Sequence, residues 1–570
     1  MVFNVVSWRA GVRADVNRFS LRPVCQAIAL MLAAGAAANA HAGGLVNLSQ
    51  IGQTMRTGAL AQELASGQAL PAGSLPFAGS SAAGATAAQQ HALQSVQNLA
   101  NAAQVIAAQE AAQASAATQA AAAPSSVPNG LAVGGLQILA GGTWMNASQP
   151  TRTTSNGQTT VTIQQVASDG TAQGAANTGK AILDWKTFNV GKNTTVDFDQ
   201  SGGNQSDGTN DWTLLNVISD PSGVPSQILG AIKAQGQILL VNRNGIVFDG
   251  SSQVNVHSLV ASSLGITNAQ FLQGIVNQTA FNTSTNSINP PQFTNNGQAT
   301  PAGDVTVEAG AQIQTAQPLS VTAGGGSVYL FGSNVTNNGT ITTPNGQILL
   351  AAGSGVYLTQ SADADVNGVT ANVDNGGTAT NTAQGLLYSP TGNVSMVGLN
   401  VNQSGVALAS TSVDQAGAVT LFAQSGVKTV AANEGNSLAY FVVPTSMGQV
   451  TFAPGSLTAV LPDETGETAL AGQPQGQSVI KAEGETIDVL GGASLLAPAG
   501  KVKLQATDDE TYMLSLDQPS LTSALNVQFP NDAARVYVAP GATVDVSGLQ
   551  DVAEAAADSE VLVDVQSNEL

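Results

Sequence analysis

Short runs of alternating apolar and polar residues dominate the chain from about residue 125 onward. The runs TTVTIQQV at 159–166 and NTTVDFDQ at 193–200 place apolar residues at every second position over most of their length, and Gly or Asn lies close to each run. Period-2 alternation predicts β-strands with one buried face. The Gly and Asn between the runs predict turns that use left-handed backbone conformations.

A loose repeat appears after Pro301. Each unit has a glycine turn, a strand with two or three alternating apolar positions, another glycine and a shorter strand, over about 20 residues. The units begin at Gly303, Gly325, Asn345, Thr391, Ala416, Ala499 and Ala534. Leucine-rich repeats would need consensus leucines in every unit, and propeller blades would need longer periods. The repeat therefore predicts a parallel β-helix, in which each rung hydrogen-bonds to the next at a spacing of about 4.8 Å.

The segment 43–124 has a different pattern. Its second half is rich in Ala and Gln and lacks Pro, which favours one or two helices, although a weakly structured spacer fits the low charge equally well. The partial apolar stripe of such a helix comprises Leu93, Val96, Leu99, Val105 and Ile106.

The first 42 residues predict a secretory signal peptide. Four arginines precede the apolar run VCQAIALMLAAGAAA, and small residues at Ala40 and Ala42 offer two cleavage sites. The only cysteine, Cys25, lies inside this segment, so the mature chain has no thiol, disulfide or cysteine metal site.

These patterns divide the chain into five parts. We expect a signal peptide at 1–42, an Ala/Gln-rich helical or spacer region at 43–124, a β-helical domain at 125–270, a loop insertion at 271–302, and β-helical shaft repeats at 303–570 that continue beyond the given chain. The net charge of −20 and the charged fraction of 9% argue against binding to nucleic acid or an anionic membrane surface.

One region resembles a known family. The chain carries Phe188-Asn189-Val190-Gly191, then Pro225-Ser226-Gln227-Ile228-Leu229-Gly230, then Asn242-Arg243-Asn244-Gly245-Ile246 and a Val-Asn-Val strand containing Asn255. In this order the motifs resemble the N-terminal secretion domain of filamentous haemagglutinin-like exoproteins of Gram-negative two-partner secretion.

The resemblance implies an all-β, right-handed parallel β-helix. It also implies export by the Sec machinery, recognition by the POTRA domains of a cognate outer-membrane transporter, and a secreted or surface-exposed adhesin with a host-cell or glycan receptor. We expect a monomer without cofactor or metal.

The motif residues allow two interpretations. Asn242 and Asn244 tolerate left-handed conformation, and Gly245 has the freest backbone, so the three suit a β-helix corner. They either form a recognition element for the transporter or serve folding alone. The same alternatives apply to the remaining motif residues: Asn189, Gly191, Pro225, Ser226, Gln227, Gly230 and Asn255.

Catalytic chemistry finds little support in the residues. Asp508-Asp509-Glu510 is the densest acidic group, but neighbours on a strand point to opposite faces. The loop SGGNQSDGTNDW lacks the second glycine of a calcium-binding repeat, and His257 is expected on an outward strand position. We therefore expect no enzyme. Two alternatives stay open: the delivery stalk of a contact-dependent toxin, and a β-helical polysaccharide-cleaving enzyme.

Overall fold

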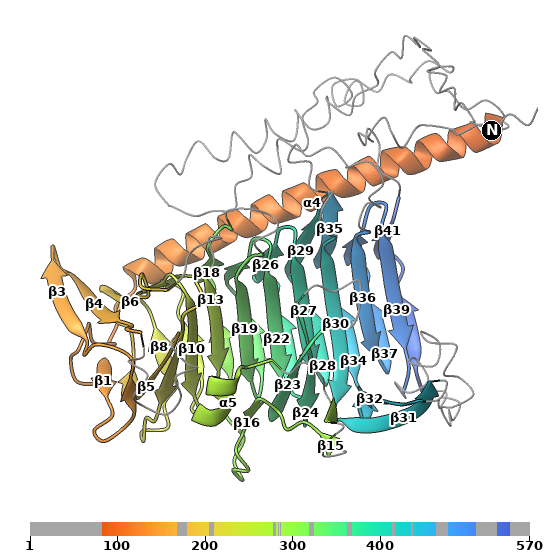
Figure 1. Ribbon diagram of the computed structural model, residues 1–570. Coiled ribbons are helices and arrows are strands. Elements are labelled where there is room, and N and C mark those ends of the chain that lie inside the picture. The colour runs from red at the N-terminus through yellow and green to blue at the C-terminus, as the bar shows by residue number, and fades with distance from the viewer. Residues whose placement is uncertain are drawn as a thin grey trace, which may run out of the picture.

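The computed structural model describes residues 82–167, 179–203, 210–276, 281–282, 284, 287–318, 324–361, 368–412, 416–434, 437–462, 477–508 and 533–547. These residues form a long stack of rungs built from three sheets that share one interior (Figure 1). The chain passes through sheet 1, sheet 2 and sheet 3 in turn and then returns to sheet 1 one rung further on.

Sheet 1 contains β1 (Leu136–Ile138), β2 (Trp144–Met145), β5 (Lys180–Phe188), β7 (Thr213–Ile218), β10 (Gln237–Asn242), β13 (Ser258–Ser262), β19 (Ser327–Gly332), β22 (Gln347–Ala352), β27 (Asn393–Gly398), β30 (Ala418–Ser425), β33 (Ser446–Met447), β36 (Val479–Gly484) and β39 (Lys501–Ala506). Sheet 2 contains β8 (Ser226–Ile228), β11 (Ile246–Phe248), β17 (Val305–Val307), β20 (Val335–Asn337), β25 (Thr378–Asn381), β28 (Asn400–Gln403), β34 (Gln449–Phe452), β37 (Thr486–Val489) and β40 (Arg535–Val538).

Sheet 3 contains β3 (Thr151–Ser155), β4 (Gln158–Gln164), β6 (Thr194–Asp199), β9 (Ala231–Ala234), β12 (Gln253–Val256), β18 (Gln312–Thr315), β21 (Thr340–Thr342), β26 (Leu386–Ser389), β29 (Val406–Thr411), β35 (Leu457–Pro462), β38 (Ser494–Leu496) and β41 (Thr543–Asp545). A separate two-stranded sheet is formed by β31 (Lys428–Glu434) and β32 (Ser437–Val443). Successive rungs pair in parallel, as between β10 and β13 or between β12 and β18. The predicted parallel β-helix is therefore confirmed.

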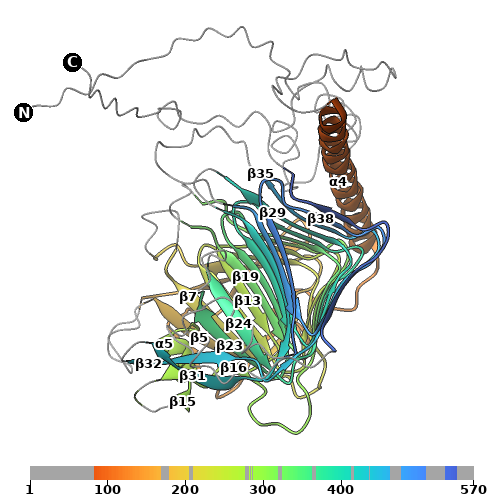
Figure 2. The same ribbon diagram turned by 90° about the vertical axis from the view of Figure 1, so that its right-hand side faces the viewer.

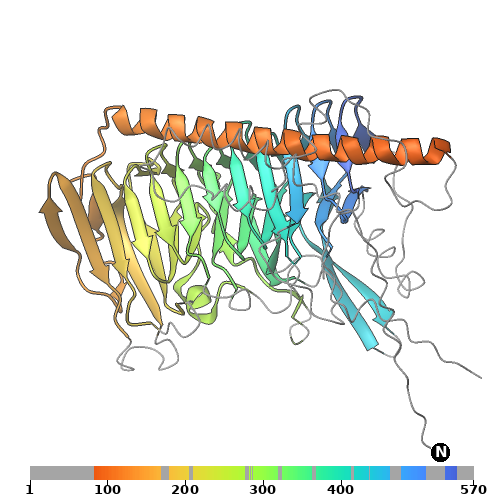
Figure 3. The ribbon, with the colours of Figure 1, turned by 90° about the horizontal axis from the view of Figure 1, so that it is seen from above.

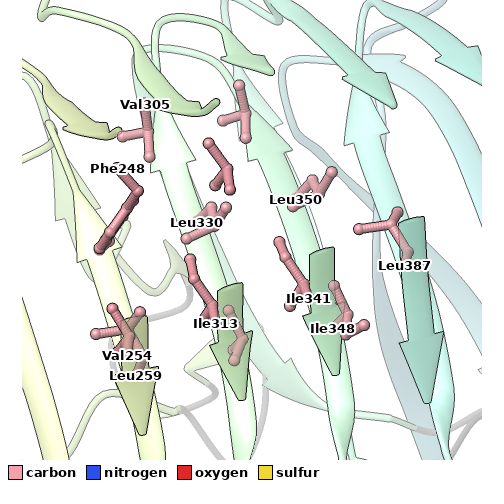
Figure 4. Close-up of a cluster of buried hydrophobic side chains, with 14 of the residues drawn as sticks. Phe248, Val254, Leu259, Val305, Ile313, Leu330, Ile341, Ile348, Leu350 and Leu387 are labelled. Atoms are coloured by element: carbon pink, nitrogen blue, oxygen red, sulfur yellow. The ribbon is translucent and has the colours of Figure 1, made fainter. Parts of the chain in front are cut away.

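The interior is a continuous apolar stack. Phe248 and Val254 of one rung, and Ile313 and Leu387 of later rungs, point their side chains inward and are almost fully buried (Figure 4). Alternation places their polar neighbours outside, which is the arrangement that the period-2 pattern predicts. Burying one such side chain contributes roughly 1.5–3 kcal/mol, so the stack is the main source of stability in a chain without disulfides.

Buried amides join the rungs inside the later part of the stack. Asn337 donates to Asn381 at 2.9 Å, and Asn381 donates to Gln403 at 2.9 Å. The Gln403 side chain then donates to the Leu457 carbonyl at 3.1 Å. All three amides are completely buried and paired, so this ladder fixes the rung register without leaving a polar group unsatisfied.

The first rung is closed by antiparallel strands. β1 and β2 pair with β5, and the hairpin of β3 and β4 extends sheet 3. Trp144, Trp185 and Phe188 pack in succession behind them, with ring centroids 5.1 and 5.3 Å apart. This cap covers the end of the apolar stack at the start of the β-helix.

Several insertions leave the rungs between sheet 1 and sheet 2. One holds α5 (Asn268–Gln273), β14 (Phe281–Asn282), β15 (Ser287–Ile288) and β16 (Phe293–Thr294). The others hold the hairpins of β23 (Gly355–Gln360) with β24 (Val369–Asp374) and of β31 (Lys428–Glu434) with β32. Phe271, Phe293 and Val373 join the second apolar cluster, which covers the outer face of sheet 1. The expected loop insertion at 271–302 falls inside the first of these insertions, which contains short strands.

A long helix, α4 (Ala82–Ala122), lies along the outside of the stack, and its axis follows the direction in which the rungs are stacked (Figures 1 and 3). In the view along the stacking direction, α4 lies outside the three sheets (Figure 2). At 1.5 Å per residue this helix is about 60 Å long, enough to pass a dozen rungs. Within the expected apolar stripe, Ile106 is buried and Val105 is exposed, so only part of the stripe packs on the sheet.

Some sequence expectations fall outside the described residues. The signal peptide at 1–42, its cleavage positions Ala40 and Ala42, and Asp509 and Glu510 belong to this group. Among the described residues, no helix combines the length and apolar character needed to cross a membrane.

Candidate recognition site in the first rungs

The corner between sheets 1 and 2 brings most of the motif residues together. Asn242 is the last residue of β10, and its side chain is buried inside the corner. Its amide nitrogen donates to Ser226 Oγ of the preceding rung at 2.9 Å, while its Oδ1 accepts from the Asn244 backbone at 3.0 Å. One side chain thus shapes its own turn and ties that turn to the neighbouring rung.

Asn244 and Gly245 complete this turn. The Asn244 amide donates to the Asp220 carbonyl of the preceding rung at 2.8 Å. Gly245 has φ +106°, and a Cβ there would lie 2.6 Å from the Asp304 carbonyl oxygen of the following rung. Both conditions require glycine, so the Asn-x-Asn-Gly element fits a folding role at a tightly stacked corner.

Asn189 lies just after β5, which is two rungs before β10 in sheet 1. Its amide donates to the Gly134 carbonyl in the cap at 2.9 Å, and its Oδ1 accepts from the Gln227 backbone at 2.8 Å. Pro225 precedes β8, where a missing N–H is tolerated. The Gln227 side chain remains exposed, so its backbone serves the corner while its amide faces solvent.

Gly191 and Gly230 meet at the next corner, between sheets 2 and 3. A Cβ on Gly230 would lie 2.1 Å from the Thr194 carbonyl and 2.4 Å from the Gly191 carbonyl. A Cβ on Gly191 would lie 2.4 Å from Asn129 Oδ1. These glycines allow neighbouring backbones to approach closely. They are structural residues of the rung stack.

Two lysines of the first rung hold the helices on the two outer faces. Lys180 Nζ donates to the carbonyls of Phe271 and Leu272 at the end of α5, at 3.0 and 2.8 Å. Burial lowers the pKa of Lys180. Lys192 Nζ donates to the Ala120 carbonyl at the end of α4 at 2.6 Å. A cation at a helix C-terminus satisfies free carbonyls and opposes the helix dipole.

The outer face of sheet 3 offers the exposed chemistry of the first rungs. Asp197, Lys233 and Asn255 face one another across β6, β9 and β12. Lys233 and Asn255 are exposed. Burial raises the pKa of Asp197, and nearby Asp199 raises it further, while Lys233 opposes both. Asn255 therefore lies apart from the corner that the other asparagines share.

The interior amides of the first rungs were missed by the sequence analysis. Gln200 donates to Gln165 Oε1 at 2.9 Å and accepts from the Gly236 backbone at 2.8 Å. Trp185 Nε1 donates to Asn216 Oδ1 at 2.9 Å, and Asn216 donates to the Leu239 carbonyl at 3.1 Å. The sequence signal that could have identified them is a polar residue at an inward strand position. Asn216 in the strand TLLNVI is an example.

The candidate metal and catalytic groups do not assemble into a site within the described part of the chain. No group of three or more His, Cys, Asp or Glu side chains gathers there in a way that could hold a metal ion. His257 lies at the turn between β12 and β13, half-buried, and burial lowers its pKa. This differs from the outward strand position expected from the sequence, because β12 ends one residue earlier.

The comparisons with known proteins match this region. The family model described as "TPS secretion domain" matches residues 136–438. Two proteins of Haemophilus influenzae named heme/hemopexin-binding protein are 26% identical over 180 residues and 32% identical over 108 residues. These alignments cover 31% and 18% of this chain but 17% and 10% of the relatives, so the chain spans a small part of their length.

Two solved structures are also similar. The HMW1 secretion domain from Haemophilus influenzae is 17% identical, with a TM-score of 0.45, over 71% of this chain and 84% of that one. The filamentous hemagglutinin secretion domain is 14% identical, with a TM-score of 0.33, over 65% of this chain and all of that one. Because the family model matches more than half of the chain, the protein belongs to the TPS secretion domain family, the exported exoproteins of two-partner secretion.

Proposed function

We propose that the capped first rungs are the export signal of this exoprotein, recognised by the POTRA domains of a cognate outer-membrane transporter after Sec export. The folded shaft then acts at the cell surface as an adhesin for a host-cell or glycan receptor. The observation that carries the proposal is the extent of the family match, which begins at β1 in the cap and ends in β32.

The geometry supports a division of labour within the first rungs. Asn189, Asn242 and Asn244 use their amides to bond neighbouring backbone or side chains, so these groups are occupied by the fold. Gln227, Lys233 and Asn255 are exposed. Recognition of the folded or folding chain would therefore use the exposed side chains, and the corners would present them in register.

Removing one rung in register tests the proposal. Deletion of 237–257 joins Gly236 to Ser258, which occupies the register position of Gln237. The matched control is deletion of 479–500, which lies beyond the family match and joins Ser478 to Lys501, the residue in the register position of Val479. Each chain is expressed in a Gram-negative host with and without the transporter, and the exported fraction is measured by immunoblotting.

We expect the first deletion to leave the chain in the periplasm and the second to be exported. Circular dichroism of both purified chains checks that each retains a β-helix. Equal export of the two deletions, or export that does not depend on the transporter, would contradict the proposal.

The heme/hemopexin binding named for the two relatives is not carried over to this chain. The aligned segments are a small part of those proteins, and the described residues of this chain include no cluster of candidate metal ligands. The toxin-stalk alternative would instead place an active domain beyond the described residues. Finding such a domain and an adjacent immunity protein would favour it over the adhesin.

A further inference from the structure

α4 packs against later rungs through an apolar stripe on the outer face of sheet 3. The stripe combines Leu386 of β26, Leu408 of β29, Leu457 of β35 and Leu496 of β38, and they cluster with Ile106 and Ala102 of α4. In the first rungs the residues in register with Leu408 are Asp197, Lys233 and Asn255, all of which are polar. The apolar positions therefore match the part of the shaft where Ala102 and Ile106 of α4 pack.

Polar contacts fix α4 at both ends and in its middle. Lys192 binds its C-terminal carbonyls at the first rung. Gln113 donates to the Asn338 carbonyl at 2.6 Å and accepts from the Gly310 backbone at 2.7 Å. Near the other end, Asn98 donates to Asp545 at 2.9 Å, and the Ser95 and Ser547 hydroxyls are 2.5 Å apart. The helix is thus held against turns and strands from the first described rungs to the last.

One side chain on the docked face does not suit a permanent contact. Glu110 is the only Asp, Glu, Lys or Arg in α4, and it lies between Ile106 and Gln113 on the buried face. Its Oε1 is buried without a hydrogen-bond partner among the described residues. Burying a carboxylate without partners is costly, whereas the protonated acid is tolerated.

We propose that α4 is a detachable strap over the apolar stripe of sheet 3, and that protonation of Glu110 controls how tightly it closes. The strap covers the stripe when Glu110 is neutral and loosens when Glu110 is ionised. The apolar stripe of the later rungs then becomes accessible outside the folded shaft.

The neighbouring charges do not offset this effect. β26 and β29 carry no Asp, Glu, Lys or Arg, and the turn after β17 carries Glu308, which accepts from Asn338 at 3.5 Å. Burial raises the pKa of Glu110 to about 7 from 4.5. Docking is therefore strongest below pH 4.5 and weakens as the pH rises through 7. Linkage predicts that the docking equilibrium constant falls about 30-fold between pH 5.5 and pH 8.5.

Hydrogen exchange on the full chain tests the proposal. Protection of the α4 amides, corrected for the intrinsic exchange rate, is measured at pH 5.5 and 8.5 by mass spectrometry. We expect the protection factors to fall about 30-fold in the wild type and less than about 3-fold in Glu110→Gln, which keeps the shape and removes the charge. A spin-label pair at Ser95→Cys and Ser547→Cys, with Cys25→Ser, separates undocking from local fraying of the helix.

Two further variants give the matched control. Ile106→Asp places a charge on the docked face and should lower α4 protection at both pH values. Val105→Asp places the same charge on the exposed face and should not. The proposal is overturned if wild-type protection is the same at both pH values, if Glu110→Gln keeps the full pH effect, or if the spin labels stay close while protection falls.

Discussion

Sheet 3 has two different outer faces, although its strands follow one register. A single column of facing residues runs through Asp197, Lys233 and Asn255 in the first rungs and continues through Tyr388, Leu408, Ala459 and Leu496 in the later ones. In the first rungs these side chains are polar, and Lys233 and Asn255 face solvent. In the later rungs Leu408, Ala459 and Leu496 are buried, and they cluster with α4.

The difference shows that one backbone pattern supports two uses of the same surface. Pairing between rungs and the inward apolar positions fix the stack, and they leave the outward positions free to vary. In this chain the outward positions are polar where the secretion domain begins and apolar where the strap docks. The outer face, and not the rung itself, distinguishes the regions.

The largest effect is expected from placing a charge in the covered half of the column. Leu408→Asp buries a carboxylate under α4, and we expect it to destabilise the docked state by about 4 kcal/mol. Hydrogen exchange of the α4 and β29 amides measures this loss of stability of the docked state. Asn255→Asp makes the matched change at the exposed half and should cost less than about 0.5 kcal/mol. Equal losses at both positions would show that the two faces do not differ as described.

A smaller effect is expected from breaking the amide ladder inside the later rungs. Asn381→Leu removes the acceptor of Asn337 and the donor to Gln403 while keeping a similar volume. Leaving buried amides unsatisfied should cost about 2–3 kcal/mol, measured as faster exchange in β25 and β28. If exchange in these strands is unchanged, the ladder does not stabilise the register.

The sequence predicted the rungs but not their phase. The units aligned at Gly303 and Ala416 begin on different sheets, because β17 belongs to sheet 2 and β30 to sheet 1. The unit at Asn345 runs from β22 into β23, which leaves the stack to form a hairpin. A glycine, a short alternating strand and a second glycine occur around corners between different pairs of sheets, so the pattern does not identify the sheet to which a strand belongs.

The candidate site, like the rungs, could be predicted only in part. The turn chemistry of Asn242, Asn244 and Gly245 could be read from the residue types, since asparagine and glycine suit a tight corner. Their partners Ser226 and Asp220 could not, because they come from another rung. The sequence also could not show that Ile106 is buried and Val105 exposed, since a helix rich in Ala has little apolar contrast between its faces.

An intermediate effect is expected at the corner of the first rungs. Asn242→Ala removes the bond to Ser226 and the acceptor of the Asn244 backbone. We expect a loss of about 1–2 kcal/mol, seen as faster exchange in β8 and β11, together with reduced export. Export that falls without any change in exchange would assign Asn242 a direct contact with the transporter in place of a folding role.

The smallest effect on stability, and the sharpest test of the comparison, comes from exposed asparagines. Asn255→Ala in β12 and Asn400→Ala in β28 each remove an exposed amide from a strand, and neither should change stability by more than about 0.5 kcal/mol. If the transporter binds the exposed outer face of sheet 3 in the first rungs, only Asn255→Ala should lower the exported fraction. The same variant alone should lower the affinity for the isolated POTRA domains, which calorimetry measures. Equal export of the two variants would remove Asn255 from the recognised surface. A loss of affinity with unchanged exchange protection would instead separate recognition from folding, because the rungs beneath the side chain would remain intact.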